Sequence, residues 1–211
     1  VDNFLEICAN SIFQVGEIKK TLTKKSPSSP FITSTLQQEV SNKFRIGPKQ
    51  TMMVLQKLYE NGLITYMRTD SVIISEEILD KIEGYIINKF GDKYHNRKQY
   101  KNKSKNSQEA HEAIRPCNIE LKNLDTLNIT ANGKYTNYDI KIYNLIWNRT
   151  IASQMTQANY ENIFININIL KPWKKSYIKN QDYYFISKII KQMFDGFMRV
   201  YKPYEDPENQ D

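Results

Sequence analysis

The sequence predicts an α+β fold, with a helical centre inserted between two β-rich regions. In the centre, apolar residues recur every three or four positions, as on one face of an amphipathic helix. Further along, Ile163, Ile165, Ile167 and Ile169 alternate with more polar residues, which is the period of a strand. Residues 10–25 are also rich in β-forming residues. The chain therefore leaves a β region, builds helices and returns.

Composition favours a polyanionic partner. Lysine and arginine total 30 against 23 acidic residues among 211, giving a net charge of +7 and an isoelectric point near 9.2. Nucleic acid fits this charge best, and an anionic membrane is the second choice. Cys8 and Cys117 lie far apart without a CxxC spacing, which argues against a disulfide framework or a zinc site. No apolar run is long enough to span a bilayer.

Two closely spaced helices are predicted ahead of a strand. The first, residues 33–44, has Thr35 and Gln38 at the spacing of a capping box. The second has Pro48 in its first turn and ends at Asn61–Gly62. Because "LITYM" follows at once, the pattern is that of a helix-turn-helix unit with a strand behind it, which suits nucleic-acid recognition.

Two more helices and a returning strand pair are predicted after this unit. Ser75 precedes the third helix and Gly91 follows it. The fourth lies within residues 135–156, and its predicted buried face consists of Ile140, Tyr143, Ile146, Trp147 and Ile151. Residues 183–201 are expected to form a strand pair around a turn at Asp195–Gly196.

A basic stretch separates the third and fourth helices. Residues 92–116 interleave several lysines and Arg97 with Tyr94 and Tyr100, which suits gripping phosphates and stacking bases. A solvated charged loop explains the same residues and is the usual role of such a run. The sequence leaves both interpretations open.

Most familiar catalytic motifs are missing from the sequence. In "HEAIR", Arg115 stands where a zinc-protease helix needs a second histidine, and there is no phosphate-binding GxxxxGK loop, GxGxxG, GxSxG or DxD-type magnesium cluster. A tyrosine nucleophile remains, because a phenol that attacks phosphorus forms an ester whose energy allows resealing. Among the 14 tyrosines, Tyr66 stands out because Arg68 shares its side-chain direction on the predicted strand. Cross-strand packing is the alternative role.

Four blocks, in order, resemble the bacterial topoisomerase I branch of the type IA DNA topoisomerases. They are "PFITSTLQQEVSNKF", "GPKQTMMVLQKLYENGLITYMRTDS", "SQEAHEAIRP" and "LIWNRTIASQMTQANYE", and the match is closest over residues 30–161. The resemblance implies that Tyr66 cleaves a single-stranded phosphodiester, giving a 5′-phosphotyrosine and a free 3′-hydroxyl. After strand passage, resealing changes the linking number by one without ATP, and negative supercoils relax.

The resemblance also implies roles for neighbours of Tyr66. Arg68 matches the arginine that positions and neutralises the scissile phosphate, and His111 matches a histidine that hydrogen-bonds near it. For Arg115, a structural salt bridge is nearly as good an explanation as DNA contact. The full set of further candidates for orientation or DNA binding, each also explicable by packing, is Thr69, Asp70, Ser107, Glu112 and Arg115.

The implied organisation has three parts. Residues 1–27 form a β arm of a hinge domain, residues 28–160 a tyrosine-bearing cap domain with a CAP-like helix-turn-helix core, and residues 161–211 the returning β arm. No stretch resembles the family's acidic Toprim domain, a "GRPSTY"-like block or a tetracysteine zinc ribbon. We therefore expect Mg²⁺ to bind the Toprim domain of the complete enzyme, and this fragment to bind no metal and to relax no DNA alone.

The expected partner is DNA, mainly single-stranded, and no membrane. We expect a monomer within a longer chain, working in the bacterial cytoplasm or in a DNA-containing organelle. The alternative function is a non-enzymatic helix-turn-helix DNA-binding module with a structural Tyr66. A degenerate gene fragment with exposed β edges is a third interpretation.

Overall fold

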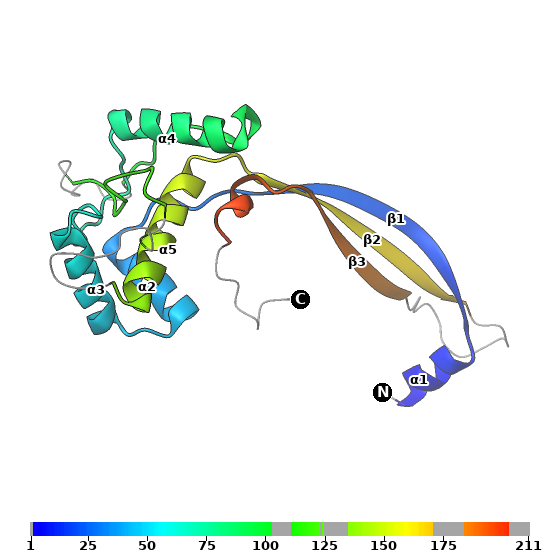
Figure 1. Ribbon diagram of the computed structural model, residues 1–211. Coiled ribbons are helices and arrows are strands. Elements are labelled where there is room, and N and C mark those ends of the chain that lie inside the picture. Colours follow the sequence, from blue (N-terminus) through cyan, green and yellow to red (C-terminus); the bar gives the residue numbers. More distant parts are fainter. Residues whose placement is uncertain (1, 103–110, 123, 125–134, 171–183, 203–211) are drawn as a thin grey trace. The chain divides into compact units, whose positions relative to one another are not determined.

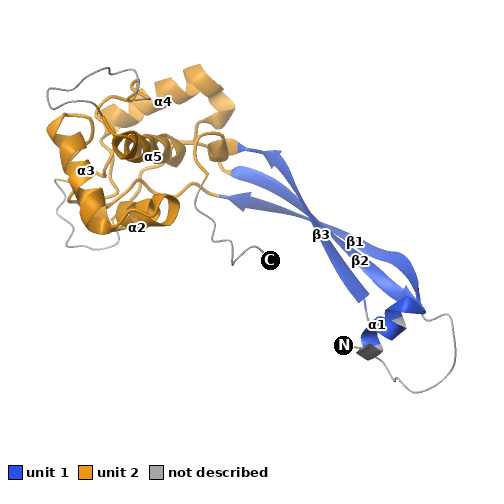
Figure 2. Cartoon of the chain, turned by 60° about the horizontal axis from the view of Figure 1, so that its bottom comes forward, with its two compact units in different colours: residues 1–25, 158–195 blue, residues 26–157, 196–211 orange. Residues whose placement is uncertain are grey.

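The computed structural model describes residues 2–102, 111–122, 124, 135–170 and 184–202. The chain divides into two compact units (Figure 2). We call Val1–Lys25 with Ala158–Asp195 the sheet unit, and Ser26–Gln157 with Gly196–Asp211 the helical unit. The mixed α and β composition that the sequence predicted is confirmed.

The sheet unit is built on a three-stranded antiparallel sheet in the order β1-β2-β3 (Figure 1). Its elements are α1 (Asp2–Ala9), β1 (Ile12–Lys25), β2 (Ala158–Leu170) and β3 (Tyr184–Phe194). Lys25 pairs with Ala158 at one end of β1, and Ile12 pairs with Leu170 at the other. Segments far apart in the sequence therefore form one backbone ladder.

Helix α1 was not predicted from the sequence. Its Phe4 ring packs edge-on against the Phe185 ring of β3, with centroids 5.8 Å apart. This contact joins residues from two different elements of the sheet unit. No local pattern within residues 2–9 indicates that it forms.

The predicted strand pair around Asp195–Gly196 is wrong. Strand β3 ends at Phe194, and Gly196 begins the short 3₁₀ helix η3 (Gly196–Arg199). Gly196 has φ 50°, and a Cβ there would lie 2.4 Å from the Thr156 carbonyl oxygen. The Phe197 amide donates to that same oxygen at 2.9 Å, and its side chain is fully buried. Packing into the helical unit thus replaces the expected turn.

The helical unit contains four α-helices among its described residues (Figure 1). They are α2 (Thr33–Phe44), α3 (Pro48–Glu60), α4 (Glu76–Phe90) and α5 (Asn137–Ser153), with the 3₁₀ helix η1 at Asp92–Tyr94. The core helix is α5, where Tyr143, Ile146, Trp147 and Ile151 are fully buried as predicted, whereas Ile140 is only half-buried. Lys57 of α3 joins it through an ion pair of 2.6 Å with the buried Asp139.

Most of the predicted helix ends are confirmed. Pro48 opens α3, Gly62 follows its C-cap with φ 67°, and α4 lies between Ser75 and Gly91. The capping box of α2 is placed wrongly, because Thr35 is the third residue of the helix and its hydroxyl accepts the Ile32 amide at 3.1 Å. Helix α2 spans the predicted residues 33–44, and its first residue, Thr33, is held by the neighbouring loop, as described below.

The strand predicted at "LITYM" is also wrong. Residues 63–67 lie in a loop with a single isolated bridge, between Ile64 and Pro116. A strand requires a continuous ladder, but this segment changes partner along its length. Its first half bonds to residues 113–117 and its second half approaches Thr33.

Candidate functional site

The loop that carries Tyr66 is fixed first by the segment after His111. The Thr65 amide donates to the Arg115 carbonyl at 2.9 Å. The Thr65 hydroxyl donates to the Ala113 carbonyl at 2.7 Å and accepts the Arg115 amide at 3.0 Å. One residue therefore makes three hydrogen bonds beside Tyr66, which restricts the backbone of this loop.

The start of α2 fixes the other half of the loop. The Thr33 amide donates to the Thr69 carbonyl at 3.0 Å, and the Thr33 hydroxyl donates to the Met67 carbonyl at 2.7 Å. In return, the Thr69 amide donates to the Thr33 hydroxyl at 2.9 Å. Met67 is itself buried, so residues 66 and 68 are held on either side of an anchored position.

Tyr66 lies on the surface of this anchored loop. Its side chain is 44% exposed, and its ring packs edge-on against Tyr59 of α3 with centroids 5.3 Å apart. Within the described part of the chain, no hydrogen-bond partner is recorded for its hydroxyl. The ring is thus oriented by Tyr59 while the phenol oxygen remains accessible to a substrate.

An open cleft of about 620 Å³ lies beside the loop. It brings together Arg68 and His111, which are distant in sequence, at the N-terminus of α2. Its lining is Ile32, Thr33, Ser34, Arg68, Thr69, Asp70 and His111. A guanidinium and the positive end of a helix dipole make such a cleft suitable for a phosphate, although Asp70 adds one negative charge.

The structure thus gathers four predicted site residues, Arg68, Thr69, Asp70 and His111, around one cleft. Tyr66 is not a lining residue and lies two positions before Arg68. The sequence analysis missed Thr33 and Ser34. They occur in the block "PFITSTLQQEV", but nothing in a single sequence shows that α2 begins against residue 69.

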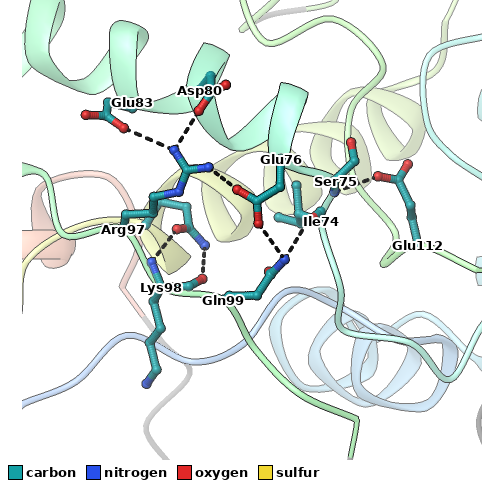
Figure 3. Close-up of polar contacts among 10 residues, drawn as sticks. Ile74, Ser75, Glu76, Asp80, Glu83, Arg97, Lys98, Gln99 and Glu112 are labelled. Atoms are coloured by element: carbon teal, nitrogen blue, oxygen red, sulfur yellow. Dashed lines mark hydrogen bonds and ion pairs between the residues drawn. The ribbon is translucent and has the colours of Figure 1, made fainter. Parts of the chain in front are cut away.

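Glu112 and Arg115 stand away from this cleft. Arg115 is only 8% exposed and forms an ion pair with Glu112, and its Nη1 donates to the Pro116 carbonyl at 3.1 Å. Glu112 also accepts the Ser75 amide at 2.9 Å, as Figure 3 shows. The structural salt bridge considered for Arg115 is therefore present. Ser107 lies outside the described residues.

The electrostatics of Glu112 follow from these contacts. Partial burial acts to raise the pKa of its carboxyl, but hydrogen bonds from Arg115 and from the Ser75 amide outweigh burial. The pKa of Glu112 is therefore lowered, and the carboxylate stays charged at neutral pH. It links the start of α4 to the segment that anchors Thr65.

The basic stretch at residues 97–100 holds helices together. Arg97 bonds to Asp80 at 2.6 Å, lies 3.4 Å from Glu83, and forms an ion pair with Glu76, all on α4 (Figure 3). The hydrogen bonds that Arg97 donates to Asp80 and Glu76 raise the pKa of its guanidinium above the ordinary value. With three carboxylates around it, Arg97 is a poor candidate for gripping phosphate.

The next residue of this stretch, Lys98, is bound to α5 through its backbone. Its amide donates to Gln154 Oε1 at 2.8 Å, and Gln154 Nε2 donates to the Lys98 carbonyl at 3.0 Å. The Lys98 ammonium lies 4.7 Å from the centre of the Tyr100 ring. Arg97 and Lys98 are therefore bound within the helical unit, whereas residues 103–110 of the basic stretch lie outside the described residues.

Two searches of the described residues bear on other kinds of site. They contain no group of three or more His, Cys, Asp or Glu side chains placed to hold a metal ion. None of their helices is both long and apolar enough to cross a bilayer.

Comparison with known proteins identifies relatives over nearly the whole chain. A family model described as DNA topoisomerase matches residues 1–211. The chain is 46% identical to "DNA topoisomerase 1 type prokaryotic" of Acanthamoeba polyphaga mimivirus over 213 residues, covering 99% of this chain and 24% of that protein. It is 41% identical to DNA topoisomerase 1 of Rickettsia bellii, covering 93% of this chain and 24% of the relative.

A solved structure of a topoisomerase is also similar to this chain. Full-length topoisomerase I from Thermotoga maritima matches with a TM-score of 0.75 and 32% identity, over 98% of this chain and 33% of that one. The chain thus spans about a quarter of the length of the curated relatives it matches. On these matches, the chain belongs to the DNA topoisomerase family, in the bacterial topoisomerase I branch of the type IA enzymes.

Proposed function

We propose that this chain carries the nucleophile and a phosphate-binding cleft of a type IA topoisomerase that cleaves single-stranded DNA. The observation that supports the proposal is the exposed Tyr66 hydroxyl on a loop anchored on both sides, two residues before Arg68. Arg68 shares its cleft with His111 and with the start of α2. Few packing roles need a phenol, a guanidinium and an imidazole on one anchored surface.

The proposed reaction is a reversible transesterification. The Tyr66 hydroxyl releases its proton to solvent as its oxygen attacks phosphorus, a P–O bond to tyrosine forms, and the bond from phosphorus to the 3′-oxygen breaks. The leaving 3′-oxygen takes up a proton and becomes a hydroxyl, while the phosphate remains on Tyr66 as a 5′-phosphotyrosine. Reversal reseals the strand without ATP, because the ester retains the bond energy.

The side chains around the cleft have distinct proposed tasks. Arg68 donates to the phosphate and balances the charge that develops on its oxygens, assisted by the dipole of α2. His111 hydrogen-bonds to the same phosphate. Thr33 and Thr65 keep the loop in position through backbone contacts.

The remaining features of the proposal concern the complete enzyme. After strand passage, resealing changes the linking number and relaxes negative supercoils. The pair α2 and α3 provides a CAP-like DNA-contacting core, and a monomer of the longer protein acts in the cytoplasm or in a DNA-containing organelle. Mg²⁺ ligands are proposed to lie in the Toprim domain, as the resemblance to the family implies.

Covalent trapping tests the role of Tyr66. The chain is mixed with the Toprim polypeptide supplied separately, Mg²⁺ and a single-stranded oligonucleotide labelled at its 3′ end, and is then denatured in detergent. We expect the label to remain on wild-type protein and to be absent from Tyr66→Phe. Label retained by Tyr66→Phe would overturn the assignment.

Tyr59→Phe is the matched control, because Tyr59 is also exposed and its ring contacts that of Tyr66. It should trap DNA nearly as well as wild type. If all variants bind DNA only reversibly, the non-enzymatic binding module becomes the better explanation. Relaxation of plasmid DNA by this chain alone, dependent on Tyr66, would refute the need for the Toprim domain.

A further inference from the structure

A second cleft lies at the opposite end of α2 from the Tyr66 site, within the helical unit. Its volume is about 280 Å³. Side chains from α2, α5 and the residues after η3 line it, chiefly Lys43, Phe44, Lys141, Asn144, Asn148 and Lys202. Three ammonium groups and two amides thus converge from segments that are far apart in sequence.

One of the three lysines serves to build the cleft. Lys43 Nζ donates to the Lys202 carbonyl, lies 3.4 Å from Glu39 and stands 4.9 Å from the centre of the Tyr201 ring. These contacts tie the end of α2 to the chain after η3. Lys43 therefore fixes the shape of the cleft, and its charge is partly balanced by Glu39.

The other two lysines, Lys141 and Lys202, form no ion pair within the described part of the chain. The Lys141 ammonium lies over the Phe44 ring at 6.0 Å from its centre. Both side chains belong to exposed residues. Among the described residues, the cleft therefore presents two lysines without an ion-pair partner and one aromatic ring, a combination that suits phosphates and bases of a single strand.

A buried acceptor in the cleft wall also lacks a partner. Asn144 Oδ1 is buried and accepts no hydrogen bond from the described part of the protein. Leaving such an oxygen unsatisfied is unfavourable, so it favours a ligand with an N–H group. A base supplies one, whereas an inorganic phosphate without protons does not.

The backbone beside the cleft is held in an uncommon conformation. Arg45, which follows Phe44, has φ 58° and ψ 35°, and it is the one residue other than glycine with positive φ that the described chain contains. Glycine or asparagine usually occupies this position after a helix. An exposed arginine here adds another positive charge next to the cleft.

The length of α2 sets the distance between the two clefts. Ser34 lines the first and Lys43 the second, and nine residues at about 1.5 Å each separate them by about 14 Å along the helix. Phosphates of one strand in a stacked duplex lie about 3.4 Å apart along the axis and those of an extended strand lie farther apart, so this distance corresponds to at most about four nucleotides. A strand bound at Arg68 is thus within a few nucleotides of the second cleft.

We propose that the cleft formed by Lys43, Lys141 and Lys202 is a second binding site for single-stranded DNA, in which Lys141 and Lys202 contact phosphates, Lys43 holds the shape of the cleft and Asn144 accepts from a base. The proposal rests on the single-stranded substrate proposed above. It adds a contact that holds a strand beyond the cleavage site and does not require Tyr66.

The salt dependence of binding tests this proposal. Fluorescence anisotropy of a labelled single-stranded oligonucleotide is measured with the whole chain and with K141Q/K202Q. Losing two phosphate contacts should reduce the slope of log Kd against log salt by about 1.4. The ratio of variant to wild-type Kd should then shrink about sevenfold between about 50 and 200 mM salt.

The double variant K81Q/K89Q is the matched control, because it removes the same charge from α4, which lines neither cleft. An equal change in slope for both double variants would overturn the proposal, since only the net charge would then matter. Circular dichroism spectra are compared with that of the wild type to check that each variant is folded.

The variant Asn144→Leu tests the role of the buried Asn144 acceptor independently of the lysines. Removing an unsatisfied buried acceptor should leave the unfolding midpoint unchanged or raised, while DNA affinity falls. Unchanged affinity would refute the role of Asn144. Because these measurements need no cleavage, a failure of covalent trapping with a normal slope change would overturn only the proposed function of Tyr66.

Discussion

The two units of the chain use similar apolar residues in opposite ways. In the sheet unit, Leu22 is 79% exposed and Ile190 is 56% exposed, whereas Leu36, Leu55 and Ile82 of the helical unit are fully buried. The sheet unit is therefore held mainly by its backbone ladder, and the helical unit by its packed core. The comparison teaches that side-chain truncation should be costly in one unit and nearly neutral in the other.

Trp147→Ala should have the largest effect on this contrast. The indole is fully buried, packs edge-on against Tyr85 at 5.4 Å, and donates to the Ile119 carbonyl at 2.9 Å. We expect the free energy of unfolding to fall by about 3–5 kcal/mol, measured by urea denaturation with circular dichroism. Tyr138→Ala, on the exposed face of α5, is the control, and an equally large loss there would contradict the packed-core explanation.

Gly196→Ala tests the backbone contact at the start of η3. The new Cβ would meet the Thr156 carbonyl, and alanine would have to adopt φ 50°. We expect a loss of about 3 kcal/mol in the free energy of unfolding. Gly62→Ala shares a positive φ but has open space around it, so its loss should be about 1 kcal/mol. Equal losses would show that steric contact at Gly196 is unimportant.

Glu112→Gln tests the link behind the Tyr66 loop. The pKa of Glu112 is lowered in the folded protein, so its contribution to stability is present above its usual pKa near 4.5 and is lost as pH falls below that value. We expect wild type to exceed Glu112→Gln by about 1–2 kcal/mol at neutral pH, with the gap closing in acid. Denaturation curves across pH measure this difference.

Glu77→Gln is the control for that experiment. The pKa of Glu77 is also lowered, first by its hydrogen bond to Lys81, but the group is on the exposed surface. We expect its substitution to leave the unfolding curve unchanged. A pH-independent gap for Glu112→Gln would instead indicate that the ion pair with Arg115 does not account for the effect.

Ile190→Thr should have the smallest effect. Ile190 lies in β3 opposite Asn162, with an exposed side chain that contributes little burial, and threonine keeps the preference for a strand. We expect a change within about 0.5 kcal/mol in the unfolding free energy. A loss comparable to that of Trp147→Ala would show that the sheet unit depends on side-chain packing after all.

The helix ends show how far local patterns can be trusted. Pro48, Gly62 and Gly91 were placed correctly because proline and glycine act on the backbone at their own positions. The capping box at Thr35 and the turn at Asp195 failed because contacts with Thr69 and Thr156, respectively, decide the local conformation. Neither contact can be inferred from the residues that neighbour Thr35 or Asp195 in the sequence.

The candidate site likewise combines residues that the sequence indicated with an arrangement that only the fold decides. Resemblance to the family selected Tyr66, Arg68 and His111, and spacing alone suggested only that Tyr66 and Arg68 lie on one face of a strand. The strand does not exist, and Arg68 meets His111 because the loop is held between α2 and residues 113–117. Ser34 entered the site only through that arrangement.

By itself, the sequence determined the α+β composition, the buried face of α5 and the family, because hydrophobic period and motif order are properties of the chain. Tertiary structure alone decided that "LITYM" is a loop, that Arg97 is bound by α4, and that two clefts lie at the ends of α2. These outcomes depend on hydrogen bonds and charges contributed by residues distant in sequence. A short segment of the sequence does not show which distant residues will interact with it.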